Sequence, residues 1–352
     1  MSSPASRVPG PDSTPTTGLP YRPLPPVSQV RPGLWSIPVP LPNTSLRYVL
    51  VYVFQTDAGP YLVDAGWDTD EAYGTLAAGL TGIGTRLEDV QGVLVTHVHP
   101  DHYGLAGRVR ETSGAWISLH PADAAVIARF KEADSVTRGL ATLRRAGAPK
   151  EALERQHRRL RALPSMRDIA RPDVLMEDGA RPEVPGWELS AIWTPGHSPG
   201  HLCFWEPRHR LMLTGDHVLP RITPNVPPPP DETADPLGDF LRSLDRLRGR
   251  GASEVLPAHE RRFTDLEGRL DDLHRHHDKR FAEVLAALEA GAEVAWDVAA
   301  HMHWSRPWDG MEGFAQQAAV GEAYAHLRAL TRRGLLHEEP GETVRWRIAI
   351  RP

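Results

Sequence analysis

Cysteine is nearly absent from this chain, since Cys203 is the only one in 352 residues. A single cysteine excludes an internal disulfide and leaves at most one thiolate for a metal. Histidine and carboxylate side chains are therefore the expected ligands of any metal ion. Cys203 itself lies in the apolar run 202–205, which is typical of a buried strand and not of a catalytic thiol.

Long apolar runs are absent as well. No stretch approaches the ~20 consecutive apolar residues of a membrane-spanning helix, and the first residues have no apolar core of signal-peptide length. We therefore expect a cytoplasmic protein with no membrane partner. The net charge of -5 is too small to indicate a partner, and 40% hydrophobic residues suffice for a large core.

The order of the patterns divides the chain into three regions. Residues 1–30 contain eight prolines and few apolar side chains, so we expect a disordered tail that cannot offset the entropy of ordering. Residues 31–261 mix strand and helix patterns, and residues 262–352 are mainly helical. The expected strands of the middle region are 33–39, 48–54, 61–64, 93–96, 115–120, 187–193, 201–205 and 210–213, with helices at 69–82, 105–112 and 236–247.

One apolar run breaks abruptly into three histidines and an aspartate. Residues 93–96 have the pattern of a buried strand, and the carboxyl end of such a strand is where open α/β sheets place their chemistry. His97 and His99 lie two residues apart, so an extended backbone points both imidazoles to one side, where they can bind one ion. The proline that follows turns the chain. Asp101 and His102 therefore point elsewhere and can bind a second ion.

Three further candidate ligands follow later strands in the same way. His197 lies in the loop after the strand 187–193, Asp216 follows an apolar run that ends at Leu213, and His259 follows the last strand pattern of the middle region. With the first cluster they give seven ligands, which is what two ions need.

In these residues the sequence resembles the metallo-β-lactamase superfamily, and within it the glyoxalase II-like hydrolases. The pattern H-x-H-x-D-H, then P-G-H, then G-D and a late histidine loop covers about residues 30–260. The resemblance implies an α/β fold, the αββα sandwich of two mixed sheets flanked by helices, with a dinuclear metal centre. The ligands that it implies are His97, His99 and His197 for one ion, Asp101, His102 and His259 for the other, and Asp216 between them.

Three more positions refine the resemblance. Asp64 matches the D-x-G turn of the family, which implies that it braces the metal loop from behind. Asp216 stands where true β-lactamases of this superfamily carry cysteine or serine, which weakens an antibiotic-hydrolysing function. Val98 stands where the flavodiiron oxygen reductases carry glutamate, which weakens a redox function.

The chemistry that this centre predicts is hydrolysis. Two divalent ions would lower the pKa of a shared water to near neutrality, and Asp101 would orient that water and accept its proton. The sequence has no G-x-S-x-G motif that would indicate a serine nucleophile instead. Zinc is the favoured metal for histidine and aspartate ligands, and iron or manganese would accept the same set.

Residues 121–171 form a basic helical insertion. Its segment 128–171 carries twelve Lys or Arg against five Asp or Glu. Such a run is either a solvated helical face or a cap over the metal site that attracts an anionic substrate such as a phosphate, coenzyme A or an RNA backbone. Residues 227–230 are four prolines, and we expect this rigid stretch at the rim of the site. The candidate substrate contacts are Arg144, Arg145, Arg158, Arg159 and Arg161, together with His201 and His217. The two histidines lie next to predicted ligands in the sequence, so the alternative role for them is to hold those ligands in place.

Residues 262–352 have the pattern of three helices, at 262–290, 294–302 and 314–333, followed by a hairpin. This resembles the winged-helix appendage of hydrolases related to lactamase-like endoribonucleases. Twelve Lys or Arg against fifteen Asp or Glu make it a poor surface for duplex DNA, so we expect it to serve packing or homodimer formation.

Three functions compete on this evidence. The favoured one is hydrolysis of a thioester, ester or lactone in a small acyl substrate, for which an anionic handle such as coenzyme A is one option. The basic insertion and the appendage support a zinc-dependent endoribonuclease as the alternative. A metal-stabilised regulatory or nucleic-acid-binding protein is the third, and the full ligand set and the acidic appendage argue against it.

Overall fold

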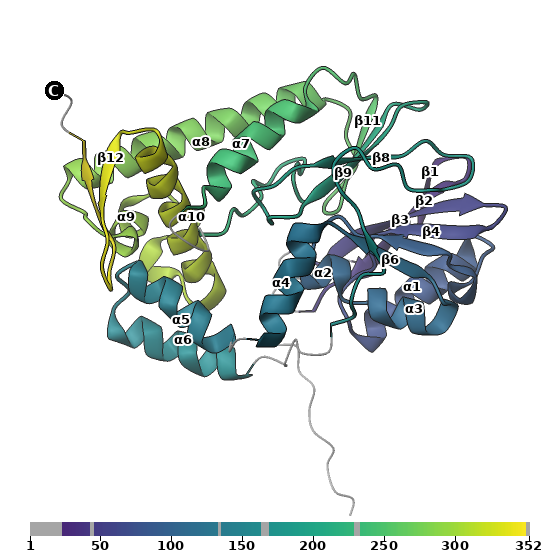
Figure 1. Cartoon of the computed structure of the whole chain (residues 1–352), viewed down its shortest axis with the longest axis horizontal. Coiled ribbons are helices and arrows are strands. Elements are labelled where there is room, and N and C mark those ends of the chain that lie inside the picture. The colour runs from purple at the N-terminus through teal and green to yellow at the C-terminus, as the bar shows by residue number, and fades with distance from the viewer. Residues whose placement is uncertain (1–22, 43–45, 133–134, 163–168, 229–232, 350–352) are drawn as a thin grey trace, which may run out of the picture.

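Two β-sheets pack face to face between layers of helices (Figure 1). The fold is given by a computed structural model that describes residues 23–42, 46–132, 135–162, 169–228 and 233–349. The larger sheet is antiparallel up to its fourth strand and parallel beyond it. In spatial order its strands are β1 (Ser28–Arg31), β2 (Leu34–Pro40), β3 (Tyr48–Thr56), β4 (Gly59–Val63), β5 (Gly92–Leu94), β6 (Trp116–Leu119) and β7 (Val174–Leu175).

The smaller sheet is mixed too, with one parallel and two antiparallel pairings. Apolar side chains from its inner face and from the larger sheet form one cluster, in which Tyr52 and Phe54 lie with Phe204 and Leu213. This cluster is the centre of the sandwich, because burying one face of each sheet removes the most apolar surface from water. In spatial order the strands are β11 (Glu254–Pro257), β10 (Leu211–Gly215), β9 (Leu202–Glu206) and β8 (Ser190–Trp193).

Helices α1 (Asp70–Gly82) and α3 (Ala106–Ser113) cover the outer face of the larger sheet. The hydroxyl of Thr69 accepts a hydrogen bond from the Ala72 amide at the start of α1 and so caps this helix. Gly79 permits a close approach to β2, since a Cβ there would lie 2.6 Å from Ile37 Cγ2.

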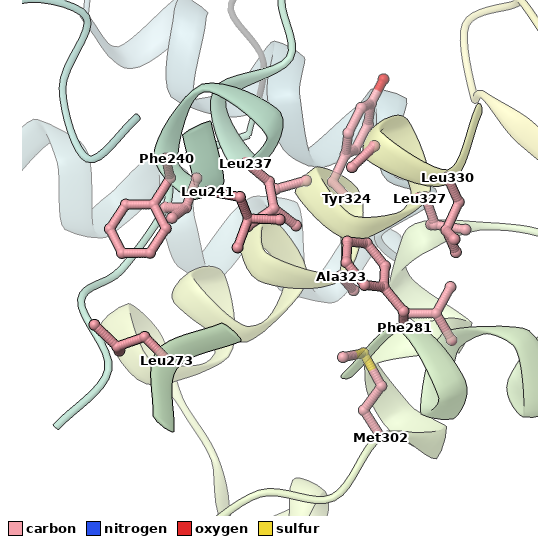
Figure 2. Close-up of a cluster of buried hydrophobic side chains, with 14 of the residues drawn as sticks. Leu237, Phe240, Leu241, Leu273, Phe281, Met302, Ala323, Tyr324, Leu327 and Leu330 are labelled. Carbon is pink, nitrogen blue, oxygen red and sulfur yellow. The ribbon is translucent and has the colours of Figure 1, made fainter. Parts of the chain in front are cut away.

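Helices cover the outer face of the smaller sheet. One of them precedes residue 261, the expected domain boundary, and the others follow it in the sequence. Figure 2 shows Phe240 on the same side of one apolar cluster as Leu273, and Phe281 beside Ala323 of the helix that also carries Tyr324. The same apolar cluster continues to buried strand residues of the smaller sheet. The 262–352 region therefore shares its core with the hydrolase region. Its elements and the preceding helix are α7 (Pro236–Leu247), α8 (Leu266–Glu289), α9 (Ala295–His301), α10 (Gly313–Arg332), β12 (Leu336–Glu339) and β13 (Arg345–Ile348).

The insertion consists of α4 (Pro121–Glu132), α5 (Ser135–Arg145) and α6 (Lys150–Ala162). In Figure 1, α5 and α6 lie beside α10, while α4 lies closer to the sheets. Leu143 and Ala146 belong to the same apolar cluster as α10, so α5 packs against the C-terminal region.

The structure confirms the α/β sandwich, and several boundaries need correction. Strand β1 begins inside the expected tail 1–30, of which residues 1–22 lie outside the described part of the chain. The strand expected at 93–96 ends at Leu94. Three helices and a hairpin form the C-terminal region as expected, and its likeness to a winged helix stays a prediction. Within the described ranges, every helix is too short or too polar to span a membrane.

Candidate metal centre

The metal loop is held from behind by Asp64, which directly follows β4. The Asp64 backbone has a φ of 63°, a left-handed conformation that is uncommon outside glycine and often marks functional turns. Its carboxylate accepts hydrogen bonds from the Thr96 amide at 2.8 Å and from the Thr96 hydroxyl at 3.0 Å. It also lies 2.8 Å from Nδ1 of His102. One carboxylate thus fixes the start of the loop and orients an imidazole.

The seven predicted ligands converge beyond the ends of the strands. One carboxylate lies between two groups of histidines: Oδ1 of Asp216 is 3.5 Å from Nε2 of His102, and its Oδ2 is 3.5 Å from Nε2 of His197. This arrangement suits a bridge between two ions. The three groups whose ligand atoms lie within 4.8 Å of one another are His97, His99 and His197; His97, His102 and Asp216; and Asp101, His102 and His259.

Hydrogen bonds on the outer side of the site set the orientation of its imidazoles. Nδ1 of His197 donates to the Asn225 carbonyl at 2.6 Å, and Nδ1 of His259 donates to the Tyr48 carbonyl at 2.9 Å. A proton held on Nδ1 leaves the lone pair of Nε2 directed into the cluster, which is the tautomer that a metal requires. The sequence gives no signal for Asn225 or Tyr48, because the groups that accept these hydrogen bonds are backbone carbonyls.

The inner atoms of these side chains fit metal ions. The Nε2 atoms of His102, His197 and His259 and Oδ1 of Asp216 are buried, and none has a hydrogen-bond partner among the described residues. A buried polar atom without a partner costs ~1–3 kcal/mol, and metal coordination removes that cost. Histidine nitrogens and aspartate oxygens in this number suit two divalent cations.

Charge and burial set opposite protonation states within the cluster. Burial, reinforced by His197, lowers the pKa of His99 to about 3. Burial also disfavours the cation of His259, but Asp216 and Asp101 outweigh it and raise its pKa to about 10, so a metal ion that binds Nε2 must displace a proton from it. Burial would raise the pKa of Asp101, yet the adjacent imidazoles hold it at about 2. The carboxylates are therefore ionised and ready to bind a cation.

His201 and His217 were candidate substrate contacts, and both are fully buried. Nε2 of His201 accepts a hydrogen bond from the Asp216 amide at 3.2 Å, and its Nδ1 lies 2.8 Å from the Thr194 hydroxyl. His201 thus holds the backbone of the bridging carboxylate. His217 packs on Phe240, with ring centroids 4.8 Å apart. Neither side chain reaches the surface, and the hydrogen bonds of His201 fit the alternative that it braces the ligands; contact of either residue with substrate stays a prediction.

The candidate arginines that the structure describes lie on α5 and α6, beside the C-terminal region. The Arg144 carbonyl accepts a hydrogen bond from the Thr343 hydroxyl, and the Arg145 carbonyl accepts one from the Val344 amide, so the end of α5 contacts the C-terminal hairpin. Arg158 is exposed, and the side chain of Arg161 lies outside the described part of the chain. Arg159 lies beside Phe314 of α10, with its guanidinium carbon 5.6 Å from the ring centroid. The insertion therefore packs against the C-terminal region.

Asp123 at the start of α4 connects two metal loops, a contact that no local sequence pattern predicts. Its Oδ2 accepts hydrogen bonds from the Val98 amide and the Ser198 hydroxyl, each at 2.8 Å, and its Oδ1 accepts one from the Gly200 amide at 2.6 Å. Gly200 is needed for this approach, because a Cβ there would lie 2.6 Å from the Asp123 backbone nitrogen. Asp123 therefore sets the spacing of the loops that carry His97 and His197.

The thiol of Cys203 takes no part in the centre. It is fully buried in β9, and burial raises its pKa to about 12. The structure thus agrees with the prediction that Cys203 is a buried strand residue and not a reactive thiol.

Known proteins share this architecture. A metallo-beta-lactamase family protein of Thermus thermophilus is 31% identical with a TM-score of 0.76, over 91% of this chain and 100% of the other. The beta-lactamase-like protein 2 homolog of Caenorhabditis elegans is 25% identical over 172 residues, which are 49% of this chain and 54% of the relative.

A shorter match connects the chain to a fungal enzyme. The atrochrysone carboxyl ACP thioesterase dmxR1 of Cryptosporiopsis sp. (strain 8999) is 32% identical over 114 residues, which are 32% of this chain and 33% of the relative. The chain thus spans about half the length of the nematode relative and a third of the fungal one. The profile described as Metallo-beta-lactamase superfamily matches residues 44–259, more than half of the chain, including all seven predicted ligands. The chain belongs to the metallo-beta-lactamase superfamily.

Proposed function

We propose that this chain is a metal-dependent hydrolase with two divalent ions, which cleaves a thioester, ester or lactone bond in a small anionic substrate. The observation that carries the proposal is the position of Asp216, whose two carboxylate oxygens face His102 on one side and His197 on the other. A carboxylate shared in this way suits two ions rather than one.

The bound ions would supply the Lewis acidity that polarises the carbonyl under attack and makes a water molecule nucleophilic near neutral pH. The chain's own residues hold this arrangement. His201 fixes the backbone of Asp216, Asp64 fixes His102, and Asp123 joins the two loops. Asp101 is the residue that we propose to accept the proton of the attacking water. Its carboxylate is ionised and its side chain is 15% exposed, so the attacking water molecule can reach it.

Zinc is the metal that we propose, because histidine nitrogen and aspartate oxygen are common zinc ligands. Iron and manganese accept the same donors, so the metal is part of the test. The acyl substrate class draws support from the fungal thioesterase, which shares part of this chain's sequence.

The proposal is tested with protein loaded separately with zinc, iron or manganese and assayed on a panel of acyl thioesters, aryl esters and lactones. Labelled single-stranded RNA is included, because the basic insertion motivated an endoribonuclease as the alternative. A His259→Ala variant, purified identically, reports contaminating activity. We expect acyl hydrolysis that requires metal and is lost in the variant. Cleavage of RNA alone, lost in the variant, would replace this proposal with the nuclease.

A further inference from the structure

A cavity between α5, α10 and the segment after Asn225 has no role in the metal chemistry described so far. Its volume is about 180 Å³, and its walls include Leu143 and Ala146 at the end of α5 and Val320 of α10. Resting on the proposed function, we infer that this cavity binds the acyl chain of the substrate, and that Arg159 binds an anionic group at the far end of that chain.

The cavity adjoins the metal centre through one residue. Asn225 lines the cavity, and its backbone carbonyl accepts the hydrogen bond from Nδ1 of the metal-ligand candidate His197 at 2.6 Å. Pro227 and Pro228 continue the same wall, while residues 229–230 lie outside the described ranges. An acyl chain whose carbonyl lies at the ions can therefore extend along this segment.

The size and lining of the cavity suit a short apolar chain. A cavity of ~150 Å³ lined by apolar side chains holds benzene, so about 180 Å³ accommodates roughly six carbon atoms. Gly321 keeps this space open, because a Cβ there would lie 3.1 Å from Pro228 Cδ. Phe314 also lines the cavity although 65% of its surface is exposed. Tyr324, which Figure 2 shows at the edge of the apolar cluster, forms another part of the wall.

A cationic site adjoins the cavity. A smaller cavity of about 40 Å³ shares Leu143 and Gln317 with the first and is lined by Arg155 and Arg159. Nη1 of Arg159 is buried and has no hydrogen-bond partner among the described residues. Gln156 of the same helix is engaged elsewhere, donating to Gln317 at 2.8 Å. A carboxylate on the substrate would give Nη1 of Arg159 a hydrogen-bond partner.

The substrate class that follows is an ester or thioester of a dicarboxylic acid of about six carbons. Its scissile carbonyl would lie at the metal centre, its methylene groups in the cavity and its free carboxylate at Arg159. Hydrolysis adds water across the acyl bond, so the products are the diacid and the released alcohol or thiol.

The test measures equilibrium binding of adipate and hexanoate to the metal-loaded protein by isothermal titration calorimetry. Both are six-carbon acids, but only adipate carries a second carboxylate. Ala318→Leu fills the cavity from α10, where Ala318 forms part of the wall, and Ala315→Leu is the matched control at an exposed position of the same helix. Arg159→Gln removes the cation, and Lys150→Gln removes an exposed charge from the same helix as its control.

We expect adipate to bind at least about tenfold more tightly than hexanoate, because of the charge-assisted hydrogen bond. Ala318→Leu should weaken both acids by about tenfold or more, since one extra branch in a fitted pocket has effects of this size. Arg159→Gln should remove only the preference for adipate. Equal binding of the two acids, or equal losses in test and control variants, would overturn the inference.

Binding and turnover separate this inference from the proposed function. If adipate binds with the expected dependence and no acyl compound is hydrolysed, the pocket stands and the hydrolase proposal fails. If acyl compounds are hydrolysed but neither Ala318→Leu nor Arg159→Gln changes binding, the hydrolase stands and the pocket fails. Because Arg159 and Ala318 lie on different helices, a folding defect in one variant leaves the other to decide.

Discussion

Replacing Asp123 tests whether the metal loops are spaced by this one buried carboxylate. Asp123→Asn keeps the shape of the side chain but turns one acceptor oxygen into a donor. The amide oxygen can serve Gly200 or Val98, and the other backbone N–H is left without an acceptor. Leaving one buried N–H unpaired costs ~1–3 kcal/mol, so we expect the free energy of unfolding to fall by about 2 kcal/mol.

Asp123→Ala and Ser198→Ala provide a larger and a smaller loss in the free energy of unfolding for comparison. The alanine variant of Asp123 leaves both backbone amides unpaired, and we expect it to lose about 4 kcal/mol. Ser198→Ala removes one hydroxyl donor and leaves the carboxylate bound to both amides, so we expect a loss of about 1 kcal/mol.

The assay is urea unfolding of the metal-free protein, followed by metal titration of the folded variants. Metal affinity should fall in the same order as stability, because the loops that carry His97 and His197 lose their fixed spacing. If Asp123→Asn unfolds at the wild-type urea concentration and binds metal as tightly as the wild type, the account of Asp123 is refuted.

Three further results are expected. Burial raises the pKa of Asp123 to about 6, so the folded protein binds this proton more tightly than the unfolded chain does. The stability advantage of the wild type over Asp123→Asn should therefore shrink as the pH rises from about 4 to 6. Urea unfolding of both proteins across this pH range checks the sign. Asp64→Asn should weaken metal binding by ~10–100-fold in competition with a chelator, because it loses the carboxylate that orients His102. Cys203 should resist iodoacetamide in the folded protein and react once per chain in urea, and rapid reaction of the folded protein would show that β9 opens readily.

The sequence predicted which residues gather at the candidate metal centre because ligand chemistry is local. His97, His99, Asp101 and His102 lie within six residues, and their spacing alone indicates two directions of approach. The later ligands each follow a strand, so the rule that chemistry gathers at strand ends brought them to the same place. The structure brings all seven together.

What sequence missed depends on contacts between distant segments. Asp123 lies 25 residues from Val98 and 77 from Gly200, and no local pattern predicts that one carboxylate reaches both. Tyr48 and Asn225 act through backbone carbonyls, which are the same in every residue.

The number of charged residues in the insertion did not predict the positions of its arginine side chains. An excess of arginine shows that some face is basic but not which way each side chain points. Arg144 and Arg145 end α5 against the hairpin, and of the suspected arginines Arg159 lies beside a cavity. The boundary at residue 261 stays a prediction. The helices after it complete the core of the smaller sheet, a contact that the change in pattern does not reveal.

The metal content of the purified chain tests the dinuclear centre most directly. Wild type and His259→Ala are loaded with zinc, freed of loose metal by gel filtration and measured by inductively coupled plasma mass spectrometry. The account predicts about two ions per wild-type chain and about one in the variant, because His259 serves only the second group of ligands. One ion or none in the wild type, or two retained without His259, would contradict it.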